Sequence, residues 1–152
     1  RIDVLVNAAG EMPLAPLWTR KVDEWERMID VNLRGVLLGI AAVLPTMQEQ
    51  GAGHIVNVAP VPAEGVSPNA AVYCGTQYAI DAVSEGLRQE HAGRVRVTVV
   101  RPDVGTARGM PAGRIAVPAE AVARSIAGAI EGVSIAVPRP SCRARPAAHA
   151  AF

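Results

Sequence analysis

The sequence predicts an α/β fold in which a parallel sheet of about four strands is flanked by helices. Short runs rich in Val and Ile alternate with longer stretches in which apolar residues recur at helical spacing. Strands separated by helices pair in parallel, because each helix carries the chain back across the sheet. The 152 residues are 50% hydrophobic and 19% charged, which suits a single globular domain.

The first predicted strand opens the chain. Ile2–Val6 is a short apolar run, and it ends in the small-residue turn Asn7-Ala8-Ala9-Gly10. Such a run followed by such a turn is typical of a buried strand that leaves the sheet at its carboxyl end. Prolines place residues 11–20 in a loop.

Two successive helical stretches follow the loop. Apolar residues keep one stripe from Val22 to Asn32, and the helical pattern then continues from Leu33 to Met47. Asn32 lies on the apolar stripe, so we expect a buried amide that is hydrogen-bonded or marks a bend. The segment Gly51-Ala52-Gly53 predicts the end of the second helix.

The middle of the chain repeats the pattern. His54–Ala59 predicts a second strand, and Pro60 and Pro62 end it. Residues 60–70 predict a loop, and a helix runs from 71 to about His91. In this helix Tyr73 and Gln77 are four residues apart and share a face, so a hydroxyl and a polar partner lie one turn from each other.

The last part is less regular. We expect a strand at 95–101, a Gly/Pro/Arg-rich loop at 103–117, a helix at 119–130 and a short strand at 134–137. Residues 141–152, rich in Pro, Arg and Ala, predict a disordered tail.

Composition excludes several kinds of partner. A net charge of +1 gives no electrostatic case for nucleic acid. Cys74 and Cys142 lie far apart without metal-ligand spacing, so we expect no metal and a reducing cytoplasm. The most apolar run, Val36–Leu44, ends at Pro45 and is shorter than the ~18 residues of a membrane span, so we expect no membrane partner. Because Arg1 enters a strand directly and is not Met, we expect a missing beginning.

Several ordered segments resemble one enzyme family, the short-chain dehydrogenase/reductases. The segments are Asp3–Gly10, Asp30–Leu33, Gly53–Val58, Tyr73–Gln77 and Arg101-Pro102 with Thr106. They are similar to the family's NNAG turn, its helix-bending asparagine, the strand before its serine, its YxxxK motif and its PGxVxT segment. The resemblance covers residues 1–140 and assigns them to the C-terminal part of a Rossmann-like, doubly wound domain.

The resemblance implies hydride transfer between NAD or NADP and an alcohol or carbonyl substrate. It implies that Tyr73 passes a proton to the substrate oxygen and that Asn32 holds a water that relays protons. The cofactor would be contacted by the turn and by the later segment, at Asn7, Ala8, Ala9, Gly10, Pro102 and Thr106.

The sequence departs from the family at the positions that carry the chemistry. Gln77 stands where the family has lysine, and Pro60 stands where it has serine. Lys21 is the only lysine, and it begins another helix. The family's glycine-rich cofactor turn precedes the matched region and has no counterpart in this sequence. We therefore expect an impaired or inactive enzyme with weak NAD(P) binding.

Two alternatives remain open. The chain could be a non-catalytic protein that kept the family's dimer surface, formed by helices 33–47 and 72–91. It could also be a divergent enzyme whose N-terminal half is supplied elsewhere. In either case Ile2–Val6 would be an apolar sheet edge that invites pairing or aggregation.

Overall fold

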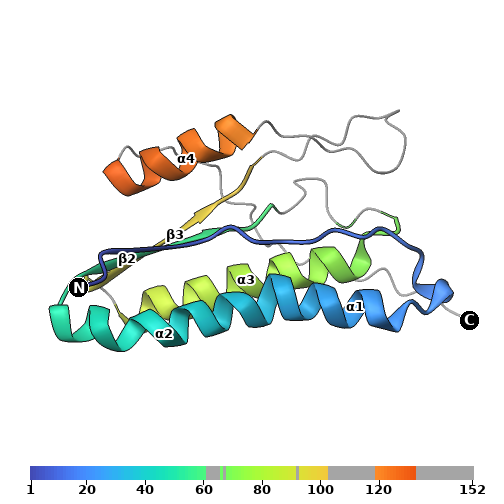
Figure 1. Ribbon diagram of the computed structural model, residues 1–152, viewed down its shortest axis with the longest axis horizontal. Coiled ribbons are helices and arrows are strands. Elements are labelled where there is room, and N and C mark those ends of the chain that lie inside the picture. Colours follow the sequence, from blue (N-terminus) through green and yellow to red (C-terminus); the bar gives the residue numbers. More distant parts are fainter. Residues whose placement is uncertain (61–65, 67, 92, 103–118, 133–152) are drawn as a thin grey trace, which may run out of the picture.

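Three parallel strands form the centre of the protein (Figure 1). The computed structural model describes residues 1–60, 66, 68–91, 93–102 and 119–132. The strands are β1 (Val4–Asn7), β2 (Gly53–Val58) and β3 (Val95–Val100), in the order β1-β2-β3. Both pairings are parallel, which confirms the predicted fold class. The expected fourth strand at 134–137, the tail 141–152 and the loop 103–117 lie outside the described residues.

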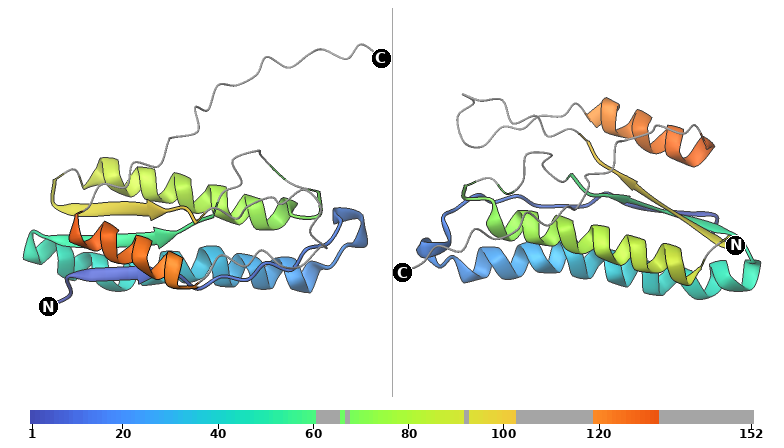
Figure 2. Two further views of the ribbon diagram at one scale, coloured as in Figure 1. Left: turned by 90° about the horizontal axis from the view of Figure 1, so that it is seen from above. Right: turned by 180° about the vertical axis from the view of Figure 1, so that it is seen from behind.

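Helices cover both faces of this sheet, as Figure 2 shows from two further directions. The short 3₁₀ turn η1 (Leu17–Thr19) precedes the helical elements of the lower face, which are α1 (Val22–Met28), η2 (Ile29–Arg34), α2 (Gly35–Gln50) and α3 (Ala71–Glu90). Helix α4 (Ala119–Glu131) packs on the opposite face, against β2 and β3. Successive strand residues therefore point alternately into two different layers.

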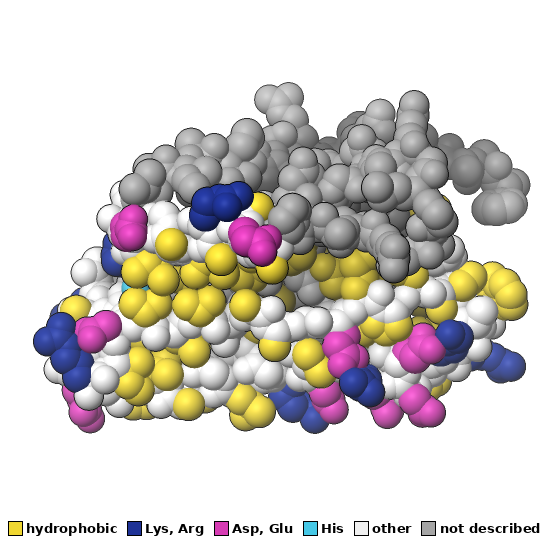
Figure 3. All heavy atoms as spheres, turned by 45° about the horizontal axis from the view of Figure 1, so that its top comes forward, with side chains coloured by type: hydrophobic (Ala, Val, Ile, Leu, Met, Phe, Trp, Pro, Cys, Tyr) yellow, Lys and Arg dark blue, Asp and Glu magenta, His cyan; other side chains and the backbone are white. Residues whose placement is uncertain are grey.

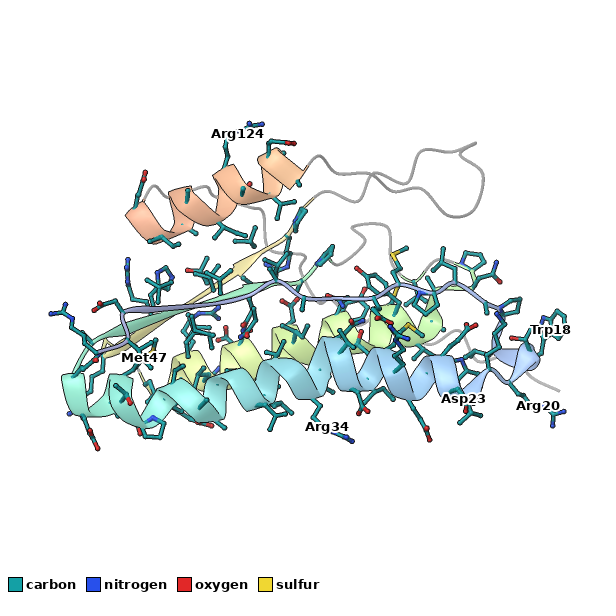
Figure 4. All side chains as sticks on the ribbon, viewed as in Figure 1. Trp18, Arg20, Asp23, Arg34, Met47 and Arg124 are labelled. Atoms are coloured by element: carbon teal, nitrogen blue, oxygen red, sulfur yellow. The ribbon has the colours of Figure 1, made fainter. Side chains whose placement is uncertain are left out.

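The hydrophobic core lies between the sheet and the long helices. Val36, Ile40, Val43 and Met47 form the buried stripe of α2, at the spacing that places them on one helix face. They pack against sheet and α3 residues that include Ile55, Val97, Ile80 and Leu87. Figure 4 shows Met47 in this layer. A Cβ at Gly53 would collide with the Met47 side chain, so glycine lets β2 start directly above it.

Helical structure is continuous from Val22 to Gln50, longer than the sequence pattern indicated. Residues 29–34 form a π-helix, a departure from regular α-helix that includes Asn32, where the sequence suggested a bend or a bonded amide. Pro45 lies inside α2 and does not end it; Gly51 does, with a left-handed φ of 68°. The helix therefore runs through Pro45, as the predicted range Leu33 to Met47 requires, and extends to Gln50. By length and composition alone this helix could cross a membrane, a test that core helices of soluble proteins also pass.

Strand β1 is an edge of the described sheet, as the sequence predicts. Val6 retains 38% of its accessible surface. Figure 3 shows hydrophobic side chains exposed between helix α4 and the long helices. An apolar edge strand of this kind presents unpaired backbone groups to another chain.

Candidate functional site

A small pocket lies beyond the carboxyl ends of β1 and β2. Its volume is about 200 Å³, and it is lined by Ala8, Ala9, Gly10, Glu11, Met12, Val58, Pro60, Tyr73, Gln77 and Ile80. Crevices at the carboxyl ends of parallel strands are where open α/β sheets bind ligands. The structure thus brings together the small-residue turn and the three positions at which the sequence suggests the family's chemistry, Pro60, Tyr73 and Gln77.

Tyr73 projects from the first turn of α3 into this pocket. Its side chain packs with Met28, Ala70 and Cys74 and is only 7% exposed. Burial, followed by the neighbouring Cys74 thiol, raises the pKa of Tyr73 to about 12. The phenol is therefore neutral at pH 7 and can donate a hydrogen bond. A raised pKa is the opposite of what a tyrosine acting as a base requires.

Gln77 lies one helical turn after Tyr73 and is 3% exposed. Its Nε2 donates to the Thr76 hydroxyl oxygen at 3.3 Å, and the Thr76 hydroxyl donates to the Tyr73 carbonyl at 2.7 Å. Because the only hydrogen of that hydroxyl is already used, the Gln77 amide orientation is fixed by the network. Gln77 Oε1 is buried without a hydrogen-bond partner.

Pro60 follows the last residue pairing of β2. The Ala59 amide donates to the Val100 carbonyl at 2.9 Å, which holds the chain in the sheet up to that point. Pro60 then leaves the sheet and lines the pocket with Tyr73. Since proline has neither a hydroxyl nor an N–H, Pro60 itself offers a ligand no hydrogen-bond donor.

Asn32 lies beneath the pocket, in the π-helix, and is 1% exposed. Its Oδ1 accepts from the Glu11 amide at 2.8 Å. Its Nδ2 donates to the Glu11 carbonyl at 2.9 Å and to Thr76 Oγ1 at 3.2 Å. Asn32 is thus the buried, hydrogen-bonded amide that the sequence predicts. Both of its N–H donors are engaged, and its proton-relay role stays a prediction.

Asn7 points away from the pocket, under the sheet. Its Nδ2 donates to Asn57 Oδ1 at 2.8 Å, and Asn57 Nδ2 donates to Ser84 Oγ at 2.9 Å. Ser84 in turn donates to the Ile80 carbonyl at 2.7 Å. Asn57 and Ser84 are fully buried.

Sequence reasoning missed the supporting residues Thr76, Asn57 and Ser84. The sequence does contain a signal that could have identified Thr76 and Ser84. Thr76 and Ser84 are eight residues apart, and they flank Ile80 on the apolar face of α3, where polar side chains need partners. The remaining predicted contacts are less central: Pro102 lies half-buried just past β3 and does not line the pocket, and Thr106 falls outside the residues that the structure describes.

The charged side chains near the site are paired with each other. Arg27 Nη2 and Glu11 Oε1 are 2.6 Å apart, and this contact raises the pKa of Arg27. Lys21 Nζ bonds Glu24 at 2.8 Å. No cation contributes to the Tyr73 pKa, whose causes are burial and Cys74. Among the described residues no His, Cys, Asp or Glu cluster could hold a metal.

Known proteins with similar sequences and structures belong to the family that these motifs resemble. Residues 1–110 match the family model of the short chain dehydrogenases. An uncharacterized oxidoreductase of Staphylococcus saprophyticus is 55% identical over 105 residues, which cover 67% of this chain and 43% of that protein. The chain therefore spans less than half the length of the curated relatives it matches.

Solved structures show the same likeness in three dimensions. Serine dehydrogenase from Escherichia coli superposes with a TM-score of 0.74 at 31% identity, over 85% of this chain and 56% of that one. A gluconate 5-dehydrogenase from Burkholderia cenocepacia, solved with NADP and tartrate, gives a TM-score of 0.63 at 33% identity, over 67% and 40% of the two chains.

Proposed function

The chain belongs to the short chain dehydrogenase family, and from that premise we propose that it forms the substrate-side part of an NAD(P)-dependent alcohol/carbonyl oxidoreductase whose chemical step is impaired. One observation supports this most strongly: Tyr73, Gln77, Pro60 and the turn Ala8–Gly10 line a single pocket. The tyrosine is in place, but the groups that would tune it are replaced.

The pocket fits one end of a nicotinamide cofactor better than a whole dinucleotide. Ala8, Ala9 and Gly10 are exposed and carry at most a methyl group, so a ligand can approach their backbone closely. A volume of about 200 Å³ is below the ~300–1,000 Å³ typical of small-molecule pockets. A bound nicotinamide would donate or accept the hydride. No part of the described chain offers a glycine-rich cradle for its phosphates.

Tyr73 is the residue that would exchange a proton with the substrate oxygen. Its neutral phenol can donate a hydrogen bond to a carbonyl, which helps reduction. Transferring that proton completely to the substrate is harder, because Gln77 carries no charge to stabilise the phenolate. Pro60 supplies no hydroxyl to orient the substrate. The missing general-acid/base contribution corresponds to roughly 10²–10⁴ in rate, and the missing electrostatic contribution to roughly 10²–10³.

The test is consumption of NADH or NADPH with a panel of ketones, followed by absorbance. We expect turnover at the detection limit for this chain, and an increase for the double variant Pro60→Ser with Gln77→Lys. Tyr73→Phe in that double variant should abolish the gain. Ready turnover by the unaltered chain, lost on Tyr73→Phe, would contradict the proposed impairment.

A second candidate function is dimerisation without catalysis through the outer faces of α2 and α3. Leu37 and Leu38 are 43% and 64% exposed, and Tyr78 on α3 is 42% exposed. Figure 2 shows these two helices side by side on one face of the sheet. Exposed apolar side chains gathered on neighbouring helices favour a protein partner, here a second copy.

Sedimentation velocity tests the second candidate. We expect a dimer for the unaltered chain and a monomer for Leu38→Glu. Leu17→Glu is the matched control, because Leu17 is 52% exposed but lies on η1. A strict monomer at all concentrations would remove this candidate and leave the first one standing.

We propose a cytoplasmic location for the chain. The free Cys74 is buried without a disulfide, and the buried stripe of the Val22–Gln50 helix packs into the protein core. A cysteine without a disulfide suits the reducing cytoplasm. A helix that packs into the core suits a core helix of such a protein. Extraction of cell membranes at alkaline pH should leave the protein in the supernatant; retention in the pellet would contradict this.

A further inference from the structure

The segment Asn7–Glu11, of which Ala8–Glu11 line the pocket, is linked at both ends to hydroxyl groups of helix α3, through Asn57 at one end and Asn32 at the other. We propose that Thr76 and Ser84 are positioning residues, which set the distance between this loop and Tyr73. The inference rests on the proposed function only in assuming that the loop and Tyr73 contact the same ligand.

The Asn7 end is held by Ser84. Ser84 Oγ accepts from Asn57 Nδ2 at 2.9 Å, and Asn57 Oδ1 accepts from Asn7 Nδ2 at 2.8 Å. The Asn7 side chain is also confined on the side that faces α2. A Cβ at Gly39 would lie 2.8 Å from Asn7 Oδ1, so the backbone of α2 closes against the amide. The side chain is thereby confined between helix and strand.

The Glu11 end is held by Thr76. Thr76 Oγ1 accepts from Asn32 Nδ2 at 3.2 Å, and the Asn32 amide bonds both the N–H and the carbonyl of Glu11, at 2.8 and 2.9 Å. Two bonds to one peptide residue fix its orientation as well as its position. Asn32 thus transmits the position of Thr76 to the backbone of the loop.

Both attachments lie on one rigid element. Thr76, Ile80 and Ser84 are four residues apart and share a face of α3, and Ile80 lines the pocket between them. Tyr73 and Gln77 belong to the same helix. A regular helix keeps its residues at fixed separations of 1.5 Å rise per residue, about 12 Å from Thr76 to Ser84. Helix α3 therefore sets the positions of both the loop and the Tyr73 phenol.

The experiment measures the loop itself, without any cofactor. Hydrogen exchange and ¹⁵N–¹H shifts of Ala8–Glu11 are compared in the full chain for Thr76→Val, Ser84→Ala and the conservative Thr76→Ser. The control is Thr98→Val, which removes a hydroxyl bonded to His54 at 2.8 Å on the other face of the sheet. We expect Thr76→Val to speed exchange of the Glu11 amide about tenfold, the factor equivalent to one net hydrogen bond, and Thr76→Ser to restore it.

Loop exchange that is unchanged in Thr76→Val, or raised equally in Thr98→Val, would overturn the proposal, because the hydroxyl would then be only a contribution to stability. If Ser84→Ala does not fold, the Thr76→Val and Thr76→Ser pair decides alone. Titration with NADPH is a separate arm. Tight binding of NADPH by the unaltered chain would count against the proposed impairment, while the exchange data still decide the positioning role.

Discussion

Two sets of residues meet at the pocket, and they differ in whether their polar groups have hydrogen-bond partners. The supporting set comprises Asn7, Asn57, Ser84, Asn32 and Thr76, and every member is hydrogen-bonded to another side chain or to the backbone. The reacting set comprises Tyr73, Gln77 and Pro60. In it Gln77 Oε1 has no partner, and Pro60 has no donor to offer. The shape of the pocket thus depends on groups other than those that would perform the chemistry.

The largest effect should come from breaking the supporting set at its centre. Asn57→Ala removes a fully buried amide that bonds Asn7 on one side and Ser84 on the other. It leaves Asn7 Nδ2 without its acceptor, removes the donor to Ser84 Oγ and opens a cavity, which together cost about 2–4 kcal/mol of unfolding free energy. Urea unfolding followed by circular dichroism measures the loss.

The matched change in the reacting set is Pro60→Ala, which removes no hydrogen bond. We expect its unfolding free energy to stay within about 1 kcal/mol of the unaltered chain. If Asn57→Ala is as mild as Pro60→Ala, the distinction between the two sets does not hold.

The second prediction restores charge to the reacting set. Gln77→Lys places an ammonium one helical turn from the phenol, and an opposite charge within ~4–6 Å of a titrating group shifts its pKa by about 1–3 units. The pKa of Tyr73 should therefore fall from about 12. The tyrosinate absorbance, recorded as a function of pH, reports it directly.

Gln77→Met controls for the loss of the amide, because it keeps the length of the side chain without a charge. The Tyr73 pKa should stay raised in this variant. An equal fall in Met and Lys variants would show that packing, rather than charge, sets the phenol's proton affinity.

How much of this could be predicted from sequence depends on the range of the interaction. Apolar periodicity located the three described strands, and Gly51 marked the end of α2, because both signals are local. The helix through Pro45 was predicted as well, because the apolar stripe continues past the proline to Met47 and packs into the core. The Asn57–Ser84 bond joins residues 27 apart, and no local pattern specifies it. The pocket positions of Tyr73, Gln77 and Pro60 were accessible only through resemblance to a family.

The third prediction uses the unaltered chain at alkaline pH. Because the pKa of Tyr73 is raised from 10.0 to about 12 by folding, the folded state holds this proton more tightly than the unfolded state does. The associated stability is complete below pH 10 and is lost as the pH rises toward 12. Tyr73→Phe should weaken this decline in urea midpoint, whereas Tyr78→Phe, at an exposed site, should not. Equal slopes in the two variants would contradict a buried, proton-retaining Tyr73.

The smallest expected effect concerns His54, a buried side chain outside the pocket that also has an atom without a hydrogen-bond partner. His54 is 2% exposed on the α4 side of the sheet; Nε2 contacts Thr98 Oγ1 at 2.8 Å, and Nδ1 has no partner. Burial, and then the charge of Arg96 on the neighbouring strand, lower its pKa below the ordinary 6.5. The unfolded chain therefore takes up this proton first as the pH falls, so stability is complete above pH 6.5 and declines below it.

His54→Gln should remove that acid-side decline, and His91→Gln, at a half-buried helix end, should keep it. If His54→Gln leaves the acid limb unchanged, an unpaired buried group outside the pocket has no cost that titration detects.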